Sequence, residues 1–121
     1  MSNFRNLLIW QKSMALTTKI YSSTNNFPKE EIFGLTSQIR RSSVSIPSNI
    51  AEGFGRESDK DLLRFLNISI GSLFEMQTQL EIAKNIYYLK ENDFNNLYED
   101  SREVERMLVS FIKKIKDRTK P

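Results

Sequence analysis

The sequence predicts an all-α protein, an antiparallel up-down-up-down four-helix bundle that forms a single domain over residues 1–121. Three observations support this fold class. Four segments repeat apolar residues at helical spacing, the breaks between them are short, and no segment alternates in the manner of a β-strand. With 121 residues, of which 39% are hydrophobic and 27% charged, the chain has the composition of one folded domain with one core.

The first two helices are expected at residues 7–23 and 29–53. Residues 25–28 separate them, because Asn favours turns and Pro cannot continue a helix. The expected seam of the first helix consists of Trp10, Met14, Thr17 and Tyr21, with Ile9, Leu16 and Ile20 beside it. Within the second helix, Pro47 removes a backbone donor and frees the carbonyl of Ser43. A kink or an interruption is therefore expected there, unless another group satisfies that carbonyl.

The third helix has the clearest pattern, and the fourth repeats it. Ser58 is expected to cap the third helix, which extends to about Tyr87, and Asn92 or Asp93 starts the fourth. The third helix carries a strict heptad seam of Leu62, Leu66, Ser69, Leu73, Met76, Leu80, Ala83 and Tyr87. The seam of the fourth consists of Leu97, Ser101, Val104, Leu108, Phe111 and Ile115.

A second apolar stripe on the third helix indicates self-association. It contains Phe65, Ile68, Ile82 and Ile86 at heptad spacing on a neighbouring face. A helix of a monomeric bundle buries about three sevenths of its positions, and an exposed apolar strip several turns long is unusual for a monomer. These four residues are therefore the expected oligomer interface. The alternative is a wide core stripe with scattered exposed aliphatic residues.

Missing residue types exclude several classes of function. The chain has no Cys and no His, which removes disulfides, Cys/His zinc sites and His-dependent catalytic triads. Paired carboxylates could do acid/base chemistry, but nothing else in the sequence marks a substrate pocket, and the GFGRES segment lacks the Lys-Ser/Thr ending of a P-loop. We therefore expect no enzymatic activity, no cofactor and no metal. No signal peptide and no apolar run of about 20 residues are present, so we expect a cytoplasmic protein without a membrane partner.

The net charge of +3 belongs entirely to a basic C-terminal tail. Residues 1–112 hold 13 Lys or Arg against 14 Asp or Glu, net −1, whereas residues 113–121 hold five against one, net +4. The tail includes Lys113, Lys114 and Lys116. It is either a solvated helix end, favoured by the helix macrodipole, or part of a surface that contacts nucleic acid.

Basic residues also recur at helical spacing elsewhere. Arg5, Lys12 and Lys19 follow one another every seven residues and would share a face if the first helix extended to Arg5. Arg40 and Arg41 form a pair in the second helix. Such rows track phosphates or are ordinary solvated faces, and both interpretations stay open for one chain. Assembly into a ring would repeat each row and strengthen its field.

The segment SIPSNIAEGFGR at residues 45–56 contains the most distinctive local pattern. Asn49 and Glu52 lie three residues apart, near several Arg side chains, and Glu75 interrupts an apolar helix. We interpret Asn49, Glu52 and Glu75 as a structural polar cluster rather than a catalytic pair.

The order and spacing of these motifs resemble the 23S ribosomal RNA intervening-sequence proteins, a four-helix-bundle family, over about residues 4–115. The most specific parts are Gln38-Ile39-Arg40-Arg41, Ser45-Ile46-Pro47, Asn49-Ile50-Ala51-Glu52-Gly53, and Gly71-Ser72 with Glu75. The resemblance implies a left-handed bundle that assembles into a homopentameric ring, with no assigned enzymatic activity. A related accessory protein of diversity-generating retroelements is a pentameric barrel that binds nucleic acid and a reverse transcriptase.

Together these observations favour a homo-oligomer that binds RNA or DNA through phosphate contacts, with structured RNA as the leading expectation. The expected contacts are the helix-one row, the Arg40-Arg41 pair and the basic tail. The alternative is an adaptor whose ring docks a partner protein and has no nucleic-acid role. Fold resemblance alone does not decide between them.

Overall fold

Four α-helices account for most of the chain in the computed structural model, which describes residues 3–120. They are α1 (Leu8–Thr24), α2 (Leu35–Phe54), α3 (Asp59–Asn85) and α4 (Glu91–Arg118). Two single 3₁₀ turns, Phe4–Asn6 and Lys29–Glu31, precede α1 and α2. The described residues contain no strand, so the all-α fold class is confirmed.

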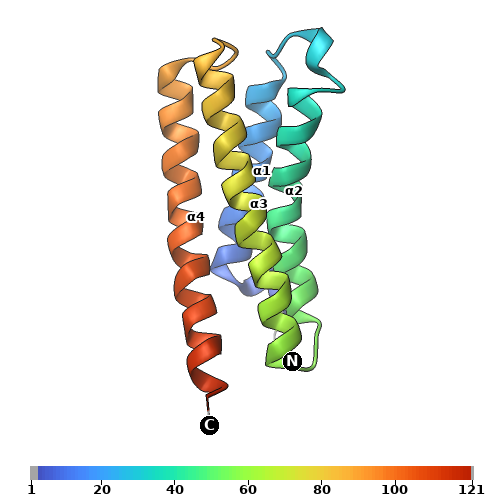
Figure 1. The fold of residues 1–121 in the computed structure, drawn as a ribbon, viewed down its shortest axis with the longest axis vertical. Helices are drawn as coiled ribbons and strands as arrows, with labels where there is room; N and C mark the ends of the chain where they lie inside the picture. The colour runs from blue at the N-terminus through green and yellow to red at the C-terminus, as the bar shows by residue number, and fades with distance from the viewer. Residues whose placement is uncertain (1–2, 121) are drawn as a thin grey trace.

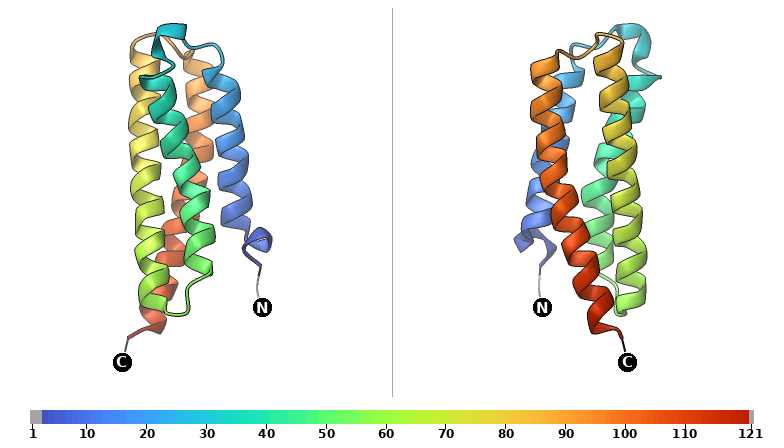
Figure 2. Two further views of the ribbon diagram at one scale, coloured as in Figure 1. Left: turned by 90° about the vertical axis from the view of Figure 1, so that its right-hand side faces the viewer. Right: turned by 60° about the vertical axis from the view of Figure 1, so that its left-hand side comes forward.

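The helices lie side by side and the chain reverses direction at each connection (Figure 1). Each helix packs against two neighbours: α2 lies between α1 and α3, and α4 lies between α3 and α1. The turned views show the connections alternating between the two ends of the bundle (Figure 2). As a result, the start of α3 and the end of α4 lie at the same end, although they are far apart in the sequence.

One apolar core runs along the bundle axis, and it contains most of the seam of α3. The seam residues Leu66, Leu73, Met76 and Leu80 are at most 1% exposed. On α1, however, the buried face is Ile9, Leu16 and Ile20, whereas Met14 and Tyr21 of the expected seam are 40% and 42% exposed. Among residues 3–120, no helix is both long enough and apolar enough to cross a membrane.

The second helix begins later than the sequence predicts. After Pro28 the chain makes only a 3₁₀ turn, and α2 starts at Leu35, directly after Gly34. Gly34 has φ −113° and ψ −119°, which is not helical, and the carboxylate of Glu31 folds back against it. That carboxylate also accepts a hydrogen bond of 3.1 Å from the backbone N–H of Leu35. Glu31 therefore serves the first turn of α2 as a cap.

Pro47 does not interrupt α2, which continues from Leu35 to Phe54. The carbonyl that a proline frees lies four residues earlier, on Ser43. Thr17 of α1 places its hydroxyl oxygen 3.0 Å from that carbonyl oxygen. A side chain of the neighbouring helix thus supplies the missing partner, and the helix passes through the proline.

The ends of α3 and α4 follow recognisable rules. The hydroxyl of Ser58 accepts a hydrogen bond from the N–H of Asp61, so the predicted cap is confirmed. Tyr87 closes α3 with a φ of 67°, a position usually taken by Gly, and the N–H of Tyr88 reaches the carbonyl of Ala83 as in a Schellman motif. The basic tail belongs to α4 as far as Arg118, so most of it is helical rather than flexible.

Candidate nucleic-acid interface

The basic row expected on the first helix is not a continuous row. Arg5 lies in the separate 3₁₀ turn, because the extended backbone of Leu7 divides that turn from α1. Lys12 and Lys19 do share a face of α1, but both are ion-paired with α4. The Nζ atom of Lys12 is 3.3 Å from Glu103, and that of Lys19 is 2.7 Å from Asp100. Acidic neighbours therefore offset much of the charge of this row.

The Arg40-Arg41 pair separates into two different environments. Arg40 holds α2 against the end of α1: its Nε donates to Thr24 at 2.8 Å, its Nη2 donates to Asn25 at 3.1 Å, and its guanidinium covers the ring of Tyr21. Arg41 is exposed and lines a hollow between α2 and α3 that also contains Glu75. Only Arg41 of this pair is available for an external anion.

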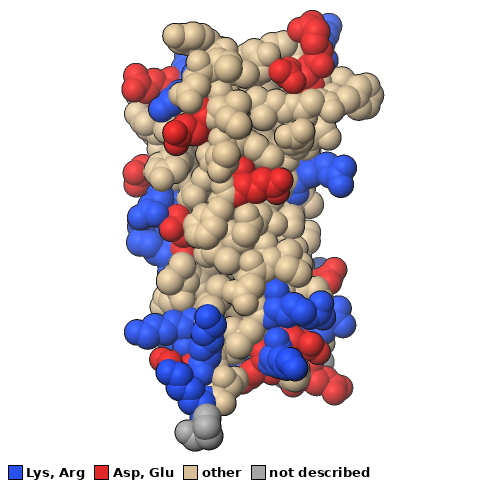
Figure 3. All heavy atoms as spheres, in the orientation of Figure 1, with Lys and Arg blue, Asp and Glu red and all other residues tan. Residues whose placement is uncertain are grey.

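The strongest gathering of basic side chains lies where α3 begins and α4 ends. Lys60 and Arg64 come from α3, Lys113, Lys114, Lys116 and Arg118 come from α4, and Lys120 follows the end of α4. We call these seven residues the basic end. In Figure 3, Lys and Arg side chains occupy the lower part of this face, on either side of an uncharged strip. Within residues 3–120, no acidic group lies within ion-pair distance of Lys113, Lys114 or Lys116.

One ion pair fixes the two helices at the basic end. Arg118 donates two hydrogen bonds to Asp59, of 2.9 Å and 2.7 Å. The bond from Arg118 lowers the pKa of Asp59 below its ordinary value and raises the pKa of Arg118. This bidentate contact sets the register of the last turn of α4 against the first turn of α3.

The opposite end of the bundle has the opposite charge. Residues 52–64 and 113–120, at the basic end, hold eight Lys or Arg against five Asp or Glu, net +3. Residues 25–38 and 79–95, at the other end, hold three against five, net −2. There the carboxylate of Glu31 accepts hydrogen bonds from the N–H of Leu35 and from the Tyr88 hydroxyl, which lower its pKa. Charge is therefore segregated along the bundle axis.

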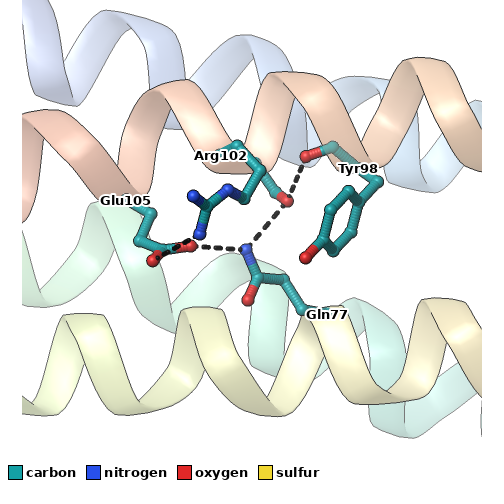
Figure 4. A network of polar contacts seen from close by, with 5 residues as sticks. Gln77, Tyr98, Arg102 and Glu105 are labelled. Atoms are coloured by element: carbon teal, nitrogen blue, oxygen red, sulfur yellow. Dashed lines mark hydrogen bonds and ion pairs between the residues drawn. The ribbon is translucent and has the colours of Figure 1, made fainter.

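A polar network in the middle of the bundle joins α3 to α4 (Figure 4). The side-chain amide of Gln77 donates to the hydroxyl of Ser101 at 3.1 Å and to Glu105 at 3.0 Å. Arg102 donates to the other oxygen of Glu105 at 2.9 Å, and Ser101 donates to the carbonyl of Tyr98 at 2.6 Å. This network and the contact between Asp59 and Arg118 join α3 to α4 at two positions along the bundle. The two contacts therefore hold α3 and α4 in one position relative to each other.

The predicted polar cluster is not a single cluster. The amide of Asn49 donates to the hydroxyl of Ser45, one turn earlier on α2, at 2.9 Å, and the hydroxyl of Ser72 on α3 donates to the same oxygen at 2.8 Å. Glu52 is turned toward solvent and approaches only Arg56, at 3.7 Å. Glu75 lies in the hollow beside Arg41. Spacing along the helix brings Asn49 and Glu52 close in sequence but directs them to different neighbours.

The predicted interface residues also divide into two groups. Phe65 is 7% exposed, because the guanidinium groups of Arg56 and Arg64 both cover its ring, with 4.7 Å from each to the ring centre. Ile68, Ile82 and Ile86 are each 44% exposed. Phe65 is thus covered within its own chain, whereas the other three form an uncovered strip on α3.

Sequence reasoning did not place Lys60, Arg64 and Phe74 at a site. The signal for the two basic residues was present, because an up-down-up-down bundle brings the start of the third helix beside the end of the fourth. In the sequence, Phe74 is recognisable only as an apolar residue of the third helix that lies outside both the seam and the second stripe. Among residues 3–120, no group of three or more His, Cys, Asp or Glu side chains is placed to hold a metal ion.

Comparison with known proteins gives one matching family model and several similar solved structures. The family model described as 23S rRNA-intervening sequence protein matches residues 5–110. A crystal structure of a protein of unknown function from the S23 ribosomal protein family of Bacteroides thetaiotaomicron is similar to this chain. It has a TM-score of 0.79 and 28% identity, and the match covers 88% of this chain and 99% of that one. The search of curated proteins gave no match.

Proposed function

This chain belongs to the 23S rRNA-intervening sequence protein family, and from that premise we propose that it is a non-enzymatic homo-oligomer that binds RNA through its basic end. The observation that carries the proposal is the group of lysines without acidic partners at the end of α4, beside Lys60 and Arg64 of α3. Each phosphate neutralised by such a side chain contributes salt-dependent affinity. The remainder of the surface offers less, because Lys12, Lys19 and Arg40 already have partners within the chain.

Assembly into an oligomer is supported by the uncovered strip on α3. The strip consists of Ile68, Gly71, Ile82 and Ile86. A Cβ atom added to Gly71 would meet no atom of this chain within 4 Å, so packing inside the bundle does not require a glycine there. A glycine inside a helix costs about 1 kcal/mol relative to alanine. Close approach by a helix of a second copy of the chain would explain a glycine at this position.

A second apolar face, on α1 and α2, supports a ring rather than a two-fold dimer. Met14 on α1 and Val44 on α2 are 40% and 39% exposed, and Tyr21 on α1 is 42% exposed although the Arg40 guanidinium covers one side of its ring. This face is distinct from the strip on α3. Two different faces favour head-to-tail contacts, in which the strip of one copy packs on the α1–α2 face of the next, and such contacts close into rings. One ring face would then repeat the basic end of every copy.

The binding part of the proposal is tested by charge reversal. Lys113→Glu/Lys116→Glu should weaken binding of a fluorescein-labelled RNA by about tenfold or more at moderate salt, measured by fluorescence anisotropy. The matched control, Lys29→Glu/Lys90→Glu, changes the net charge equally at the opposite end and should have little effect. Equal losses in both variants, or no binding by the unaltered protein at low salt, would contradict the proposal. Recovery of one protein partner after nuclease treatment would then favour the adaptor alternative.

The assembly part is tested by sedimentation equilibrium. The unaltered protein should give about five times the chain mass of 14.2 kDa if the family resemblance extends to the ring. Gly71→Leu should lower this mass while the helical circular dichroism signal is retained, because the new side chain meets nothing within its own chain. A monomer whose mass does not depend on concentration would overturn the assembly proposal.

A further inference from the structure

Beside the basic end, an elongated groove runs between α3 and α4 with two unlike walls. The α3 wall is apolar and contains Ile70 and Phe74. The α4 wall carries Val109 and then, at helical spacings of four and three, Lys113 and Lys116, and Lys120 follows beyond the end of α4. Phe74 is 47% exposed and Val109 is 52% exposed. The groove therefore sets an accessible aromatic ring beside a row of cations.

The charge on the α4 wall is only partly offset. Asp117 is the single acidic residue that lines the groove, and it lies 3.5 Å from Lys120. Lys113 and Lys116 have no acidic group within 4.0 Å among residues 3–120. The helical rise of 1.5 Å per residue places Lys113 and Lys116 about 4.5 Å apart along α4, and Lys120 follows after the helix ends. A polyanion lying in the groove would meet several of them together.

We infer that this groove binds single-stranded nucleic acid, with phosphates on the lysine wall and an unpaired base against Phe74. The inference rests on the proposed function and specifies its ligand. Single-strand binding without sequence preference combines a row of basic side chains for the phosphates with aromatic side chains on which the bases stack. The groove supplies both, as its lysines and the exposed ring of Phe74. A duplex offers the same phosphates but keeps its bases stacked and paired, so none of its bases is free to stack on the Phe74 ring.

The groove lies on a different part of α3 from the strip proposed for assembly. The residues of α3 that line the groove are Ile70 and Phe74. Ile68, Gly71 and Ile82 of α3 are not among its lining residues. Nucleic acid and a second copy of the chain can therefore occupy separate faces. This separation makes it possible to alter one contact without altering the other.

The test uses the full chain and a labelled 20-nucleotide oligo(dT), with a duplex of the same length as a second probe. Phe74→Ala should weaken oligo(dT) binding by about tenfold, because one stacked base is lost, and should leave duplex binding unchanged. Phe74→Trp should retain tight binding. Ile32→Ala is the matched control, since this apolar residue is similarly exposed, at 50%, and belongs to neither the groove nor the faces proposed for assembly, and it should leave both affinities unchanged.

Further outcomes separate this inference from the proposed function. If the unaltered protein binds neither these probes nor the labelled RNA, the proposed function fails and the inference fails with it. If it binds the RNA but neither probe, only the groove inference is overturned. If oligo(dT) and duplex bind equally and Phe74→Ala has no effect, the proposed function stands and only the groove inference is overturned. A change of sedimenting mass in Phe74→Ala, or competition by poly-glutamate as effective per charge as by oligo(dT), also overturns it, because the groove would then be a contact between copies or a site for any polyanion.

Discussion

The contact between α2 and α3 differs in kind from the outer contact between α1 and α4. Buried neutral groups join α2 to α3: Ser42 donates to Gln79 at 2.7 Å, and Ser69 donates to the carbonyl of Ile46 at 2.8 Å. Exposed ion pairs of Lys12 and Lys19 join the outer edges of α1 and α4. Removing one partner of a buried polar contact lowers the stability of the protein, whereas exposed ion pairs contribute little to that stability.

This difference also explains which lysines are available for a ligand. Lys12 and Lys19 lie opposite carboxylates of α4, and these carboxylates offset the charge of the two lysines locally. Lys113 and Lys116 belong to the last turns of α4 and lie beside Ile70 and Phe74 of α3, with no acidic group within 4.0 Å among residues 3–120. A lysine row on a helix therefore indicates an anion site only when the neighbouring helix offers no carboxylate to it.

The largest expected effect is at the closest approach of α2 and α3. A Cβ atom on Gly53 would lie 3.0 Å from Cδ1 of Leu62 and 3.1 Å from Cβ of Phe65. Gly53→Val should therefore destabilise the protein by about 2–3 kcal/mol through overpacking, measured by urea unfolding. Gly55→Val is the control, because its Cβ would meet only the carbonyl of Glu52 at 3.4 Å. Equal losses in the free energy of unfolding for the Gly53 and Gly55 variants would show that α2 and α3 can move apart easily.

The next effect comes from the buried hydroxyl contact. Ser42→Ala removes the donor to the Gln79 amide oxygen, and both residues are at most 6% exposed. The free energy of unfolding should fall by about 1–2 kcal/mol. A Ser42→Ala/Gln79→Leu double variant should recover part of that loss, because neither polar partner then stays buried alone. Additive losses in the double variant would contradict this account of the contact.

The ion pairs between α1 and α4 should contribute less. Lys19→Ala removes a contact of 2.7 Å to Asp100, but the two side chains are 59% and 38% exposed. We expect a loss of about 0.5 kcal/mol or less in urea unfolding, decreasing further in high salt. A loss as large as that of Ser42→Ala would remove the distinction between the two helix contacts.

The smallest effect concerns pH. The pKa of Glu31 is lowered by the Leu35 N–H and the Tyr88 hydroxyl, and the pKa of Asp59 is lowered by Arg118. Each contributes stability above its unfolded pKa, near 4.5 and 3.8, and loses it as pH falls through the folded value. Thermal unfolding should therefore shift downward below about pH 4.5. Glu31→Gln/Asp59→Asn should flatten this dependence, and an identical slope in that variant would refute the assignment.

Much of the fold could be predicted from the sequence because heptad spacing reports directly on which side of a helix is buried. The seam of α3 is the clearest case, and even its serine, Ser69, is fully buried. The first helix shows the limit of this reasoning. Two rows of apolar residues lie side by side on α1, and only packing against α2 and α4 decides that Leu16 and Ile20 face inward.

The site was less predictable, because it depends on residues distant in sequence. Pro47 was expected to disturb α2, but Thr17 of another helix satisfies the freed carbonyl. Likewise, spacing alone shows Lys12 and Lys19 as a basic row and cannot show that Glu103 and Asp100 lie opposite. The basic tail was found from charge counting, whereas its continuation onto Lys60 and Arg64 required the direction of each helix.

The central claim is that the lysines of α4, and not those of α1, contact the nucleic acid. The most direct test is the slope of the logarithm of the oligo(dT) binding constant against the logarithm of salt concentration. Lys113→Ala/Lys116→Ala should reduce this slope by about 1.4, since each single-strand phosphate contact contributes about 0.7. Lys12→Ala/Lys19→Ala should leave the slope unchanged. An unchanged slope in the first variant, or an equal reduction in the second, would contradict the claim.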